Sequence, residues 1–178
     1  MDFVLKKEFE CPGLMYINLI TANNIKELRK KIDSANNLIV VKGNSDEINR
    51  AALENKRTDI LLSPEYGREK DFIHFRNSGL NQVLCKLANK NKIAIGFNFS
   101  DLINAEKKEI ILGKMMQNVI LCRKYKVKIV IGSFANKKNE IKNRSELMSF
   151  GKVLGMNGKE VKEGLNFKKK EKAIKIIK

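Results

Sequence analysis

Five short apolar segments, separated by segments of helical periodicity, most constrain how this chain can fold. Each apolar segment is rich in isoleucine or valine and leucine, and is apolar along most of its length instead of alternating with polar residues. Strands that are covered on both faces have this composition, so the pattern predicts a parallel sheet with helices packed on it. The predicted strands are residues 14–20, 38–42, 59–63, 93–97 and 128–133.

Repeated strand–helix units leave two architectures open, an open doubly wound sheet or a barrel-like closure. A full eight-unit barrel typically needs about 250 residues, whereas this chain has 178. We therefore expect one α/β domain over residues 1–178, and the closed alternative would be a reduced TIM-barrel-like fold. We expect residues 166–178 to form a basic C-terminal helix or tail, because lysines surround its few apolar residues.

Polar residues that can accept a hydrogen bond from a nearby backbone N–H mark where the helices begin. Asn24, Asn44 and Asn157 are each followed by a glutamate three residues later, as in a capping box. Ser78 precedes another stretch of helical spacing. One long helix is predicted near residues 104–125, where apolar residues recur on one stripe.

The charge of the chain is strongly positive and unevenly distributed. The formal net charge is +16, of which residues 123–178 contribute +12 and residues 1–122 contribute +4. Such a balance favours a polyanionic partner, and a basic face for nucleic acid is the interpretation we prefer. Solubility, or a lysine-rich genome, is the alternative explanation.

Several common kinds of site are absent from the sequence. There is no GxGxxG or Walker loop for a nucleotide and no GxSxG motif for a nucleophile. The three cysteines form no CxxC pair, which argues against a zinc site and a secreted disulfide framework. No apolar stretch is long enough for a membrane span or a signal peptide. We expect a cytoplasmic protein with no membrane partner.

Metal-dependent hydrolysis would require ligands that this chain largely lacks. His74 is the only histidine, whereas zinc and two-metal sites usually combine several histidines with carboxylates. Asp59, Glu65, Asp71 and Asp101 could coordinate Mg²⁺ through oxygen. However, Asp59 begins a predicted strand and Glu65 and Asp71 flank basic residues, so a solvated loop is the interpretation we prefer. We therefore assign no catalytic residue and no metal ligand.

Basic side chains follow two of the predicted strands. Loops at the carboxyl ends of parallel strands emerge on the same side of a sheet, so we expect the loops after residues 59–63 and 128–133 to share a rim. Such a rim could neutralise several phosphates, with a steep dependence of binding on salt. The candidate RNA-binding residues are Arg68, Lys70, Arg76, Lys137, Lys138, Lys142 and Arg144.

Four blocks of sequence, taken in order, resemble the protein component 3 family of ribonuclease P. They are INRAALENKRTD at 48–59, DILLSPEYGR at 59–68, SGLNQVLCKLANKNKIAIGFN at 78–98, and the segment from KYKVKIVIGSFANKK to KEVKEGL at 124–165. The loop at 69–77 is longer than this family usually has, Gly96 stands where relatives are usually acidic, and the N-terminal 40 residues match poorly.

The resemblance implies a fold and a set of partners. The family has a TIM-barrel-like fold similar to the polymerase-and-histidinol-phosphatase barrels but without their metal ligands. Its members assist the catalytic RNA that removes the 5′ leader from precursor tRNA. They pair with protein component 2, often as a heterotetramer, and join components 1 and 4. The Mg²⁺ needed for hydrolysis would be used by the RNA, so we expect no cofactor on this chain.

The expected function is therefore an RNA-binding subunit of a ribonucleoprotein endonuclease that is not catalytic alone. Two alternatives stay open. One is a metal-dependent phosphoesterase on a reduced barrel, against which the histidine count argues. The other is a non-catalytic protein-binding scaffold whose charge only aids solubility.

Overall fold

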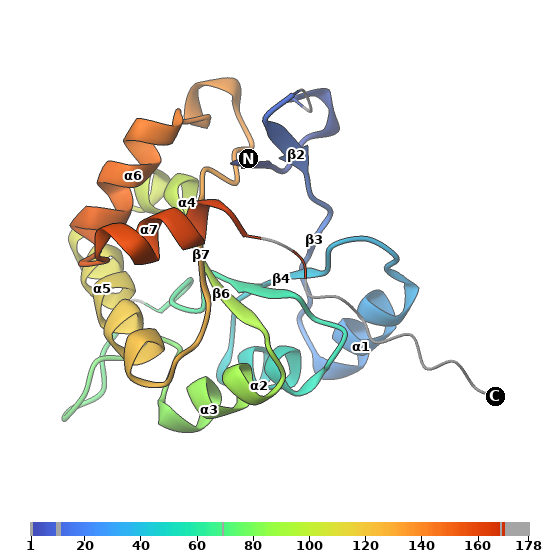
Figure 1. The fold of residues 1–178 in the computed structure, drawn as a ribbon. Helices are drawn as coiled ribbons and strands as arrows, with labels where there is room; N and C mark the ends of the chain where they lie inside the picture. The colour runs from blue at the N-terminus through green and yellow to red at the C-terminus, as the bar shows by residue number, and fades with distance from the viewer. Residues whose placement is uncertain (1, 10–11, 69, 168, 170–178) are drawn as a thin grey trace.

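A five-stranded parallel sheet forms the centre of the computed structural model, which describes residues 2–9, 12–68, 70–167 and 169 (Figure 1). The strands lie side by side in chain order, and each pairs in parallel with the next. This order does not reverse, as it would in a doubly wound sheet. The strands are β3 (Leu19–Ile20), β4 (Val40–Lys42), β5 (Ile60–Leu62), β6 (Ala94–Asn98) and β7 (Ile129–Gly132).

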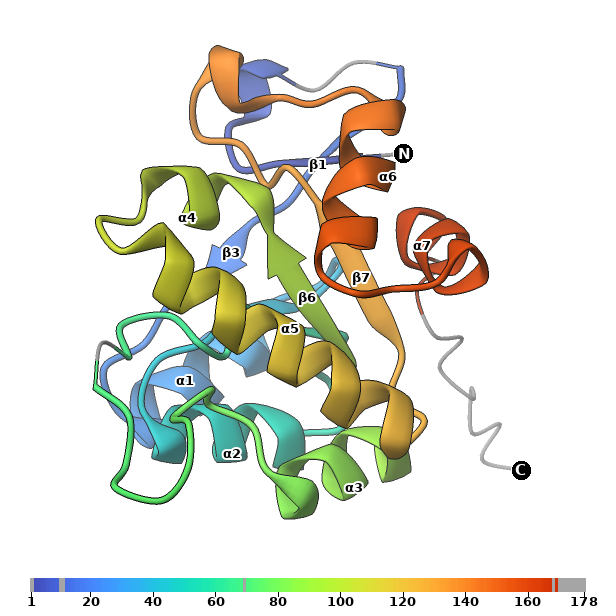
Figure 2. The ribbon, with the colours of Figure 1, turned by 90° about the vertical axis from the view of Figure 1, so that its left-hand side faces the viewer.

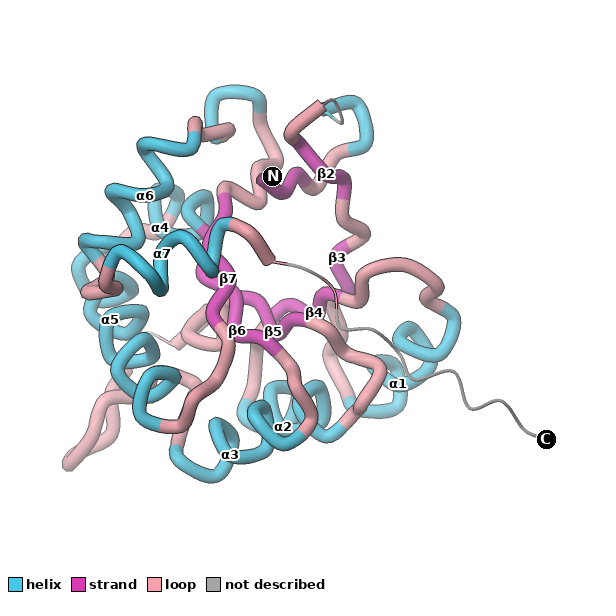
Figure 3. The backbone as a smooth tube through the Cα atoms, viewed as in Figure 1, coloured by secondary structure: helices cyan, strands magenta, loops and turns pink. Residues whose placement is uncertain are grey.

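A two-stranded parallel sheet completes the arrangement at the N-terminus. Strand β1 (Asp2–Val4), which the sequence did not reveal, pairs with β2 (Leu14–Tyr16). Val4 also bridges in parallel to Ala135, just after β7. The chain continues from β2 directly into β3, so the strands follow one another around a common interior (Figure 3). The single strand predicted at 14–20 is wrong in this respect, because its two halves pair with different neighbours.

Helices cover the outer face of the five-stranded sheet, while α6 and α7 pack beside β7 (Figures 1 and 2). Short 3₁₀ turns occur at Lys7–Phe9 and Lys138–Glu140. The helices are α1 (Ile25–Ser34), α2 (Asp46–Glu54), α3 (Gln82–Lys90), α4 (Phe99–Asn104), α5 (Lys108–Lys124), α6 (Arg144–Val153) and α7 (Gly158–Leu165).

Two of the predicted helix starts are confirmed and two are wrong. Asn24 accepts a hydrogen bond from the N–H of Glu27 at 2.9 Å, and Asn157 forms a full capping box with Glu160. Helix α2 instead begins after Ser45, and α3 begins after Asn81 instead of Ser78. The long helix predicted near 104–125 is confirmed as α5, and the short helix α4 is a separate element that ends at Asn104 before it.

Two apolar clusters lie on opposite sides of the sheet, as the period of two along a strand requires. Val41 and Leu61 face the helices, whereas Val40 and Ile60 face the interior with Phe134. This explains why the strands read as continuous apolar runs, since both faces are covered.

The chain after α7 crosses towards the opposite side of the interior (Figure 1). Phe167 packs against the interior apolar cluster, and the ammonium of Lys169 donates to the carbonyl of Asn37 at 2.9 Å. The predicted basic tail over residues 166–178 lies outside the described residues, apart from 166, 167 and 169. Across the described chain, we find no helix with the length and apolar character needed to cross a membrane.

Candidate nucleic-acid interface

The loop from Ser133 to Asn143, which follows β7, is held in one shape from inside. The buried carboxylate of Glu140 accepts hydrogen bonds from the backbone N–H groups of Asn136 and Lys137, at 2.8 and 3.1 Å. The side chain of Asn104 in α4 donates to the same carboxylate at 2.9 Å. Burial alone would raise the pKa of Glu140, but these hydrogen bonds together outweigh it and the pKa lies below its usual value.

A second anchor ties this loop to the N-terminal strand and to α4. The backbone N–H of Ser133 donates to Asp2 at 2.7 Å, while the Ser133 hydroxyl accepts from the N–H of Lys142 at 2.9 Å. The hydroxyl of Ser100 donates to the Ser133 carbonyl at 2.7 Å. Phe134 adopts a left-handed φ of 45°, which is uncommon for a residue with a large side chain. The loop is therefore fixed before any partner arrives.

Four of the predicted RNA-binding residues lie on or beside this loop. Lys137 and Lys138 are exposed, as is Arg144 at the start of α6. Lys142 is partly covered, and its ammonium lies 3.7 Å from Glu146 and 5.6 Å from the centre of the Phe99 ring. We call these four residues the cationic loop. It presents positive charge from a rigid backbone, so little conformational entropy is lost when it meets an anionic surface.

Arg68 has a different role from the one predicted. Its side chain is 8% exposed and is surrounded by protein acceptors. The guanidinium donates to the carbonyls of Pro64 and Asn44, at 3.0 and 2.9 Å, and to the side chain of Asn77 at 2.7 Å. It also pairs with Asp46 at 2.7 Å. Arg68 thus connects the segment after β5 to the start of α2, and its donors face the protein instead of solvent.

The substitution Arg68→Lys is expected to lower the free energy of unfolding by about 2 to 4 kcal/mol, since lysine keeps the charge but leaves buried acceptors unpaired. Urea unfolding followed by circular dichroism measures this. Arg76→Lys is the matched control, because the Arg76 side chain is 48% exposed, and we expect a change within about 0.5 kcal/mol. A stable Arg68→Lys variant that loses RNA affinity would contradict this assignment.

Lys70 and Arg76 lie on a second basic loop, residues 70–77, which is held against α5. The ammonium of Lys114 is fully buried, donates to the carbonyl of Arg68, and lies 3.1 Å from Asp71. Arg76 donates to the carbonyl of Gly113 at 2.9 Å. A buried lysine on α5 therefore fixes the base of the loop, while Lys70 and Arg76 stay exposed.

The structure does not bring the tips of the two basic loops together into the shared rim that we expected. Figures 1 and 2 show the loop at 133–143 at the top of the molecule and the loop at 70–77 at the bottom. The segment after β5 begins at the rim, at Ser63, but then turns outward along α5 because of its contacts with Lys114 and Gly113. The predicted rim is corrected to two separate basic surfaces.

A polar cluster that the sequence did not single out lies where β4, β5 and β6 end. Lys42, the last residue of β4, pairs with Asp101 in α4, and the hydroxyl of Ser63 donates to the same carboxylate. Ser63 has a left-handed φ of 51°. Ser63 and Asp101 border a hollow of about 490 Å³ that is also lined by Tyr66 and Asn136.

Glu65 is the least expected member of this region, because a solvated loop was predicted for it. Its side chain is 1% exposed, and its Oε2 accepts from the amide of Asn118 at 3.1 Å. Burial, with a smaller contribution from the charge of Asp101, raises the pKa of Glu65 to about 8. Asp59 is buried too, and accepts from the N–H of Ile39 at 2.9 Å. The sequence neighbours of Glu65 are Pro64, Tyr66 and Gly67, which form no periodic apolar pattern, so nothing in the sequence indicated that Glu65 is buried.

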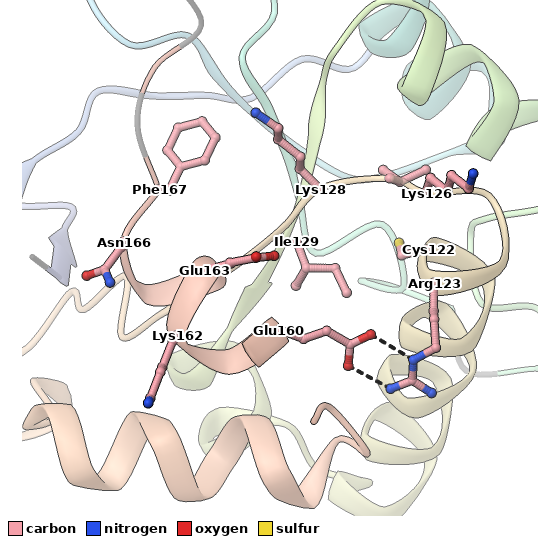
Figure 4. A pocket seen from close by; sticks show the side chains of 11 residues that line it. Cys122, Arg123, Lys126, Lys128, Ile129, Glu160, Lys162, Glu163, Asn166 and Phe167 are labelled. Atoms are coloured by element: carbon pink, nitrogen blue, oxygen red, sulfur yellow. Dashed lines mark hydrogen bonds and ion pairs between the residues drawn. The ribbon is translucent and has the colours of Figure 1, made fainter. Parts of the chain in front are cut away.

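A larger hollow of about 710 Å³ lies at the opposite end of β7, between α5 and α7 (Figure 4). Arg123 and Glu160 form a bidentate pair across it, at 2.7 and 2.8 Å. Three of its four other charged side chains are lysines, so the lining is basic overall even though Arg123 is already paired. The four are Lys126, Lys128, Lys162 and Glu163.

Within the described part of the chain, no three histidine, cysteine, aspartate or glutamate side chains come together as a metal site would require. His74 is exposed on the loop at 70–77 and is not among the residues that line the 490 Å³ hollow. The cationic loop, the second basic loop and the polar hollow are thus the features from which a function has to be argued.

Comparison with known proteins supports one family. The model of the family described as RNase P subunit p30 matches residues 16–174. Curated relatives named ribonuclease P protein component 3 include those of Methanosarcina mazei (35% identical; 76% of this chain, 54% of the relative) and Thermococcus gammatolerans (37% identical; 73% of this chain, 58% of the relative).

A solved structure is also similar. A chain in the cryo-EM structure of archaeal ribonuclease P with mature tRNA superposes with a TM-score of 0.71 at 32% identity, over 82% of this chain and 62% of that one. This chain therefore spans a little over half the length of the relatives it matches. With a match across most of its length, the chain belongs to the RNase P subunit p30 family.

Proposed function

We propose that this chain is an RNA-binding subunit of ribonuclease P, which helps the catalytic RNA to remove the 5′ leader from precursor tRNA. The observation that carries the proposal is the cationic loop, a rigid group of four basic side chains of which Lys137, Lys138 and Arg144 are exposed. Family membership supports the identity of the RNA. Phosphate contacts of this kind hold and orient RNA without reading its sequence.

The proposed architecture is a reduced TIM-barrel-like fold formed by one domain over residues 1–178. Its support is the chain-order sheet and the bridge between Val4 and Ala135, which together connect the strands around the interior. The apolar cluster that includes Val40, Ile60 and Phe134 would fill this interior, as side chains fill small barrels.

The division of labour follows from the chemistry that the chain offers. The RNA would carry out hydrolysis with its own Mg²⁺, and this chain would bind no cofactor and supply no catalytic residue. Its contribution would be to lower phosphate repulsion where RNA segments approach each other, which matters most when Mg²⁺ is scarce. We place the assembly in the cytoplasm, with protein component 2, as a heterotetramer, and components 1 and 4 as protein partners.

The proposed RNA contacts are the cationic loop, residues Lys137, Lys138, Lys142 and Arg144, with Lys70 and Arg76 as a second and separate surface. We leave out Arg68, whose donors are taken by protein groups. Each phosphate neutralised changes the slope of log affinity against log salt by about 0.7 to 0.9. The cationic loop alone should therefore give a slope of about −3.

The test is the affinity of the purified chain for ribonuclease P RNA over a series of salt concentrations, measured by filter binding. A steep loss of affinity with salt is the expected result, and a footprint on the RNA should appear when component 2 is added. Binding that is absent at low salt, with and without component 2, would contradict the proposal.

A protein-binding scaffold is the second candidate, and one observation favours it. The loop at 70–77 carries Ile73, which is 94% exposed, between Phe72 and Phe75, whose rings lie 4.6 Å apart. Large exposed apolar side chains mark interaction surfaces. This candidate predicts a protein complex with no RNA footprint, so the same experiment separates it from the main proposal.

A further inference from the structure

The second basic loop carries aromatic rings that the protein interior does not use, and it projects outward from the body of the molecule (Figures 1 and 2). Phe72 and Phe75 are 49% and 64% exposed, and their ring centres lie 4.6 Å apart. His74, between them in the sequence, is exposed as well. Aromatic side chains usually bury large areas in a core, so rings left in water on one loop mark a surface that meets a partner.

The loop holds these rings out from a fixed base. The backbone N–H of Phe72 donates to the carbonyl of Phe75 at 3.0 Å, which closes the loop near its tip. At the base, the N–H of Asn77 donates to the carboxylate of Asp71 at 3.0 Å, and the ammonium of Lys114 in α5 lies 3.1 Å from the same carboxylate. Such a base lowers the entropic cost of ordering the loop on a partner.

The charge beside the rings favours an anionic partner. Lys70 and Arg76 are exposed at the two ends of the loop. The one acidic residue within 70–77, Asp71, lies closest to the buried ammonium of Lys114 and lies 3.8 Å from Arg76. Lys70 forms no ion pair within the described part of the chain. A protein groove would have to supply acidic groups for these cations, whereas RNA supplies phosphates together with the flat faces of its bases.

Exposed rings with cations beside them are the combination by which proteins hold unpaired RNA. The rings stack on the faces of bases, and the cations neutralise the phosphates that join those bases. Bases within a duplex are stacked on one another, so their faces are not open to a side chain. The pattern of this loop therefore fits a single strand better than a helix of RNA.

We propose that the second basic loop binds an unpaired stretch of the RNA partner, with bases stacked on Phe72 and Phe75 and phosphates beside Lys70 and Arg76. The inference rests on the proposed RNA-binding function and gives this second surface a preference for single-stranded RNA. The cationic loop offers charge without exposed rings, so it contacts the phosphates of paired and unpaired RNA alike.

The experiment compares the affinity of the whole chain for a short oligouridylate and for an RNA duplex of the same length, by fluorescence anisotropy over a salt series. The double variant Phe72→Leu with Phe75→Leu keeps the apolar surface and the charge but removes both rings. We expect it to bind the single strand at least about fivefold more weakly at every salt concentration. The slope of log affinity against log salt should not change, because no phosphate contact is lost. Its affinity for the duplex should equal that of wild type.

Two further double variants separate stacking from charge and from exposed apolar surface in general. Lys70→Gln with Arg76→Gln should flatten the salt slope for the single strand by about 1.4, since each lost phosphate contact removes about 0.7. The matched control for the rings is Ile120→Ala with Val153→Ala. These side chains on α5 and α6 are 62% and 56% exposed, and this control should bind both RNAs as wild type does.

Wild-type affinity of the leucine variant for the single strand would overturn the proposal, and so would equal losses for the single strand and the duplex. A leucine variant that binds both RNAs normally but no longer forms a complex with component 2 would make the loop a protein-docking surface instead.

The same proteins are tested for affinity to ribonuclease P RNA, which separates the two proposals. Binding of that RNA by wild type, with no effect of the rings on the single strand, would reject the stacking and leave the proposed function standing. Absence of ribonuclease P RNA binding by wild type would reject the proposed function itself.

Discussion

Replacing Lys137, Lys138 and Lys142 by glutamate is expected to weaken binding to ribonuclease P RNA by at least about 100-fold at low salt, and to flatten the salt slope by about 2 to 3. The physical reason is that three cations on one rigid loop become three anions facing phosphate. The loop itself should persist, because Glu140 holds it through the backbone N–H groups of Asn136 and Lys137. Filter binding over a salt series measures both quantities.

The matched control reverses three lysines away from both basic loops and both hollows. Lys26, Lys30 and Lys90 lie on α1 and α3 and change the net charge by the same amount. We expect these reversals to weaken binding only through the overall field, which salt screens strongly. Equal losses in the two triple variants would show that binding depends on net charge alone, against the role given to the cationic loop.

Replacing Glu65 by glutamine should make the protein more stable relative to wild type as the pH rises. The Glu65 carboxyl has a pKa of about 8 in the folded protein, against a usual value of 4.5. Between these values the unfolded chain has lost a proton that the folded chain retains, so wild-type stability falls with rising pH by up to about 1.4 kcal/mol per unit. Glutamine cannot titrate, and its oxygen can still accept from the amide of Asn118.

Urea unfolding of both proteins at several pH values between about 5 and about 8 measures this difference. The difference in the free energy of unfolding between Glu65→Gln and wild type should increase steadily from about pH 5 to about pH 8 and stay constant at higher pH. Glu106→Gln, at an exposed position on the rim of the same hollow, should stay within about 0.5 kcal/mol of wild type. Parallel stability curves for wild type and Glu65→Gln would contradict the burial of an uncharged carboxyl group.

The strands could be predicted because their signal is local. Runs such as 38–42 and 93–97 are apolar on both faces, and the structure confirms strands at β4 and β6. Strand β1 could not be predicted, since its three residues gain their place only by pairing with β2 and with Ala135. The split of 14–20 has the same cause, because pairing partners far along the chain decide where a strand bends.

The candidate interface was predictable in part. Basic residues after a strand correctly placed Lys137 and Lys138 on an exposed loop, because a charge run in a loop rarely becomes buried. Arg68 looks no different in sequence, yet it is enclosed by the carbonyl of Pro64 in its own segment and by that of Asn44 from the segment before α2. Glu65 is the opposite case. A carboxylate in a loop is expected to be exposed and charged, but the Glu65 side chain is buried and its pKa is raised to about 8.

The most direct test of the central claim is precursor-tRNA cleavage by reconstituted ribonuclease P at low Mg²⁺. The catalytic RNA is combined with component 2 and with wild-type chain, the Lys137, Lys138 and Lys142 charge-reversal variant, or no chain. We predict that wild type stimulates cleavage at limiting Mg²⁺, that the charge-reversal variant stimulates much less, and that high Mg²⁺ narrows the difference. Cleavage that is the same with and without this chain at limiting Mg²⁺ would contradict the account.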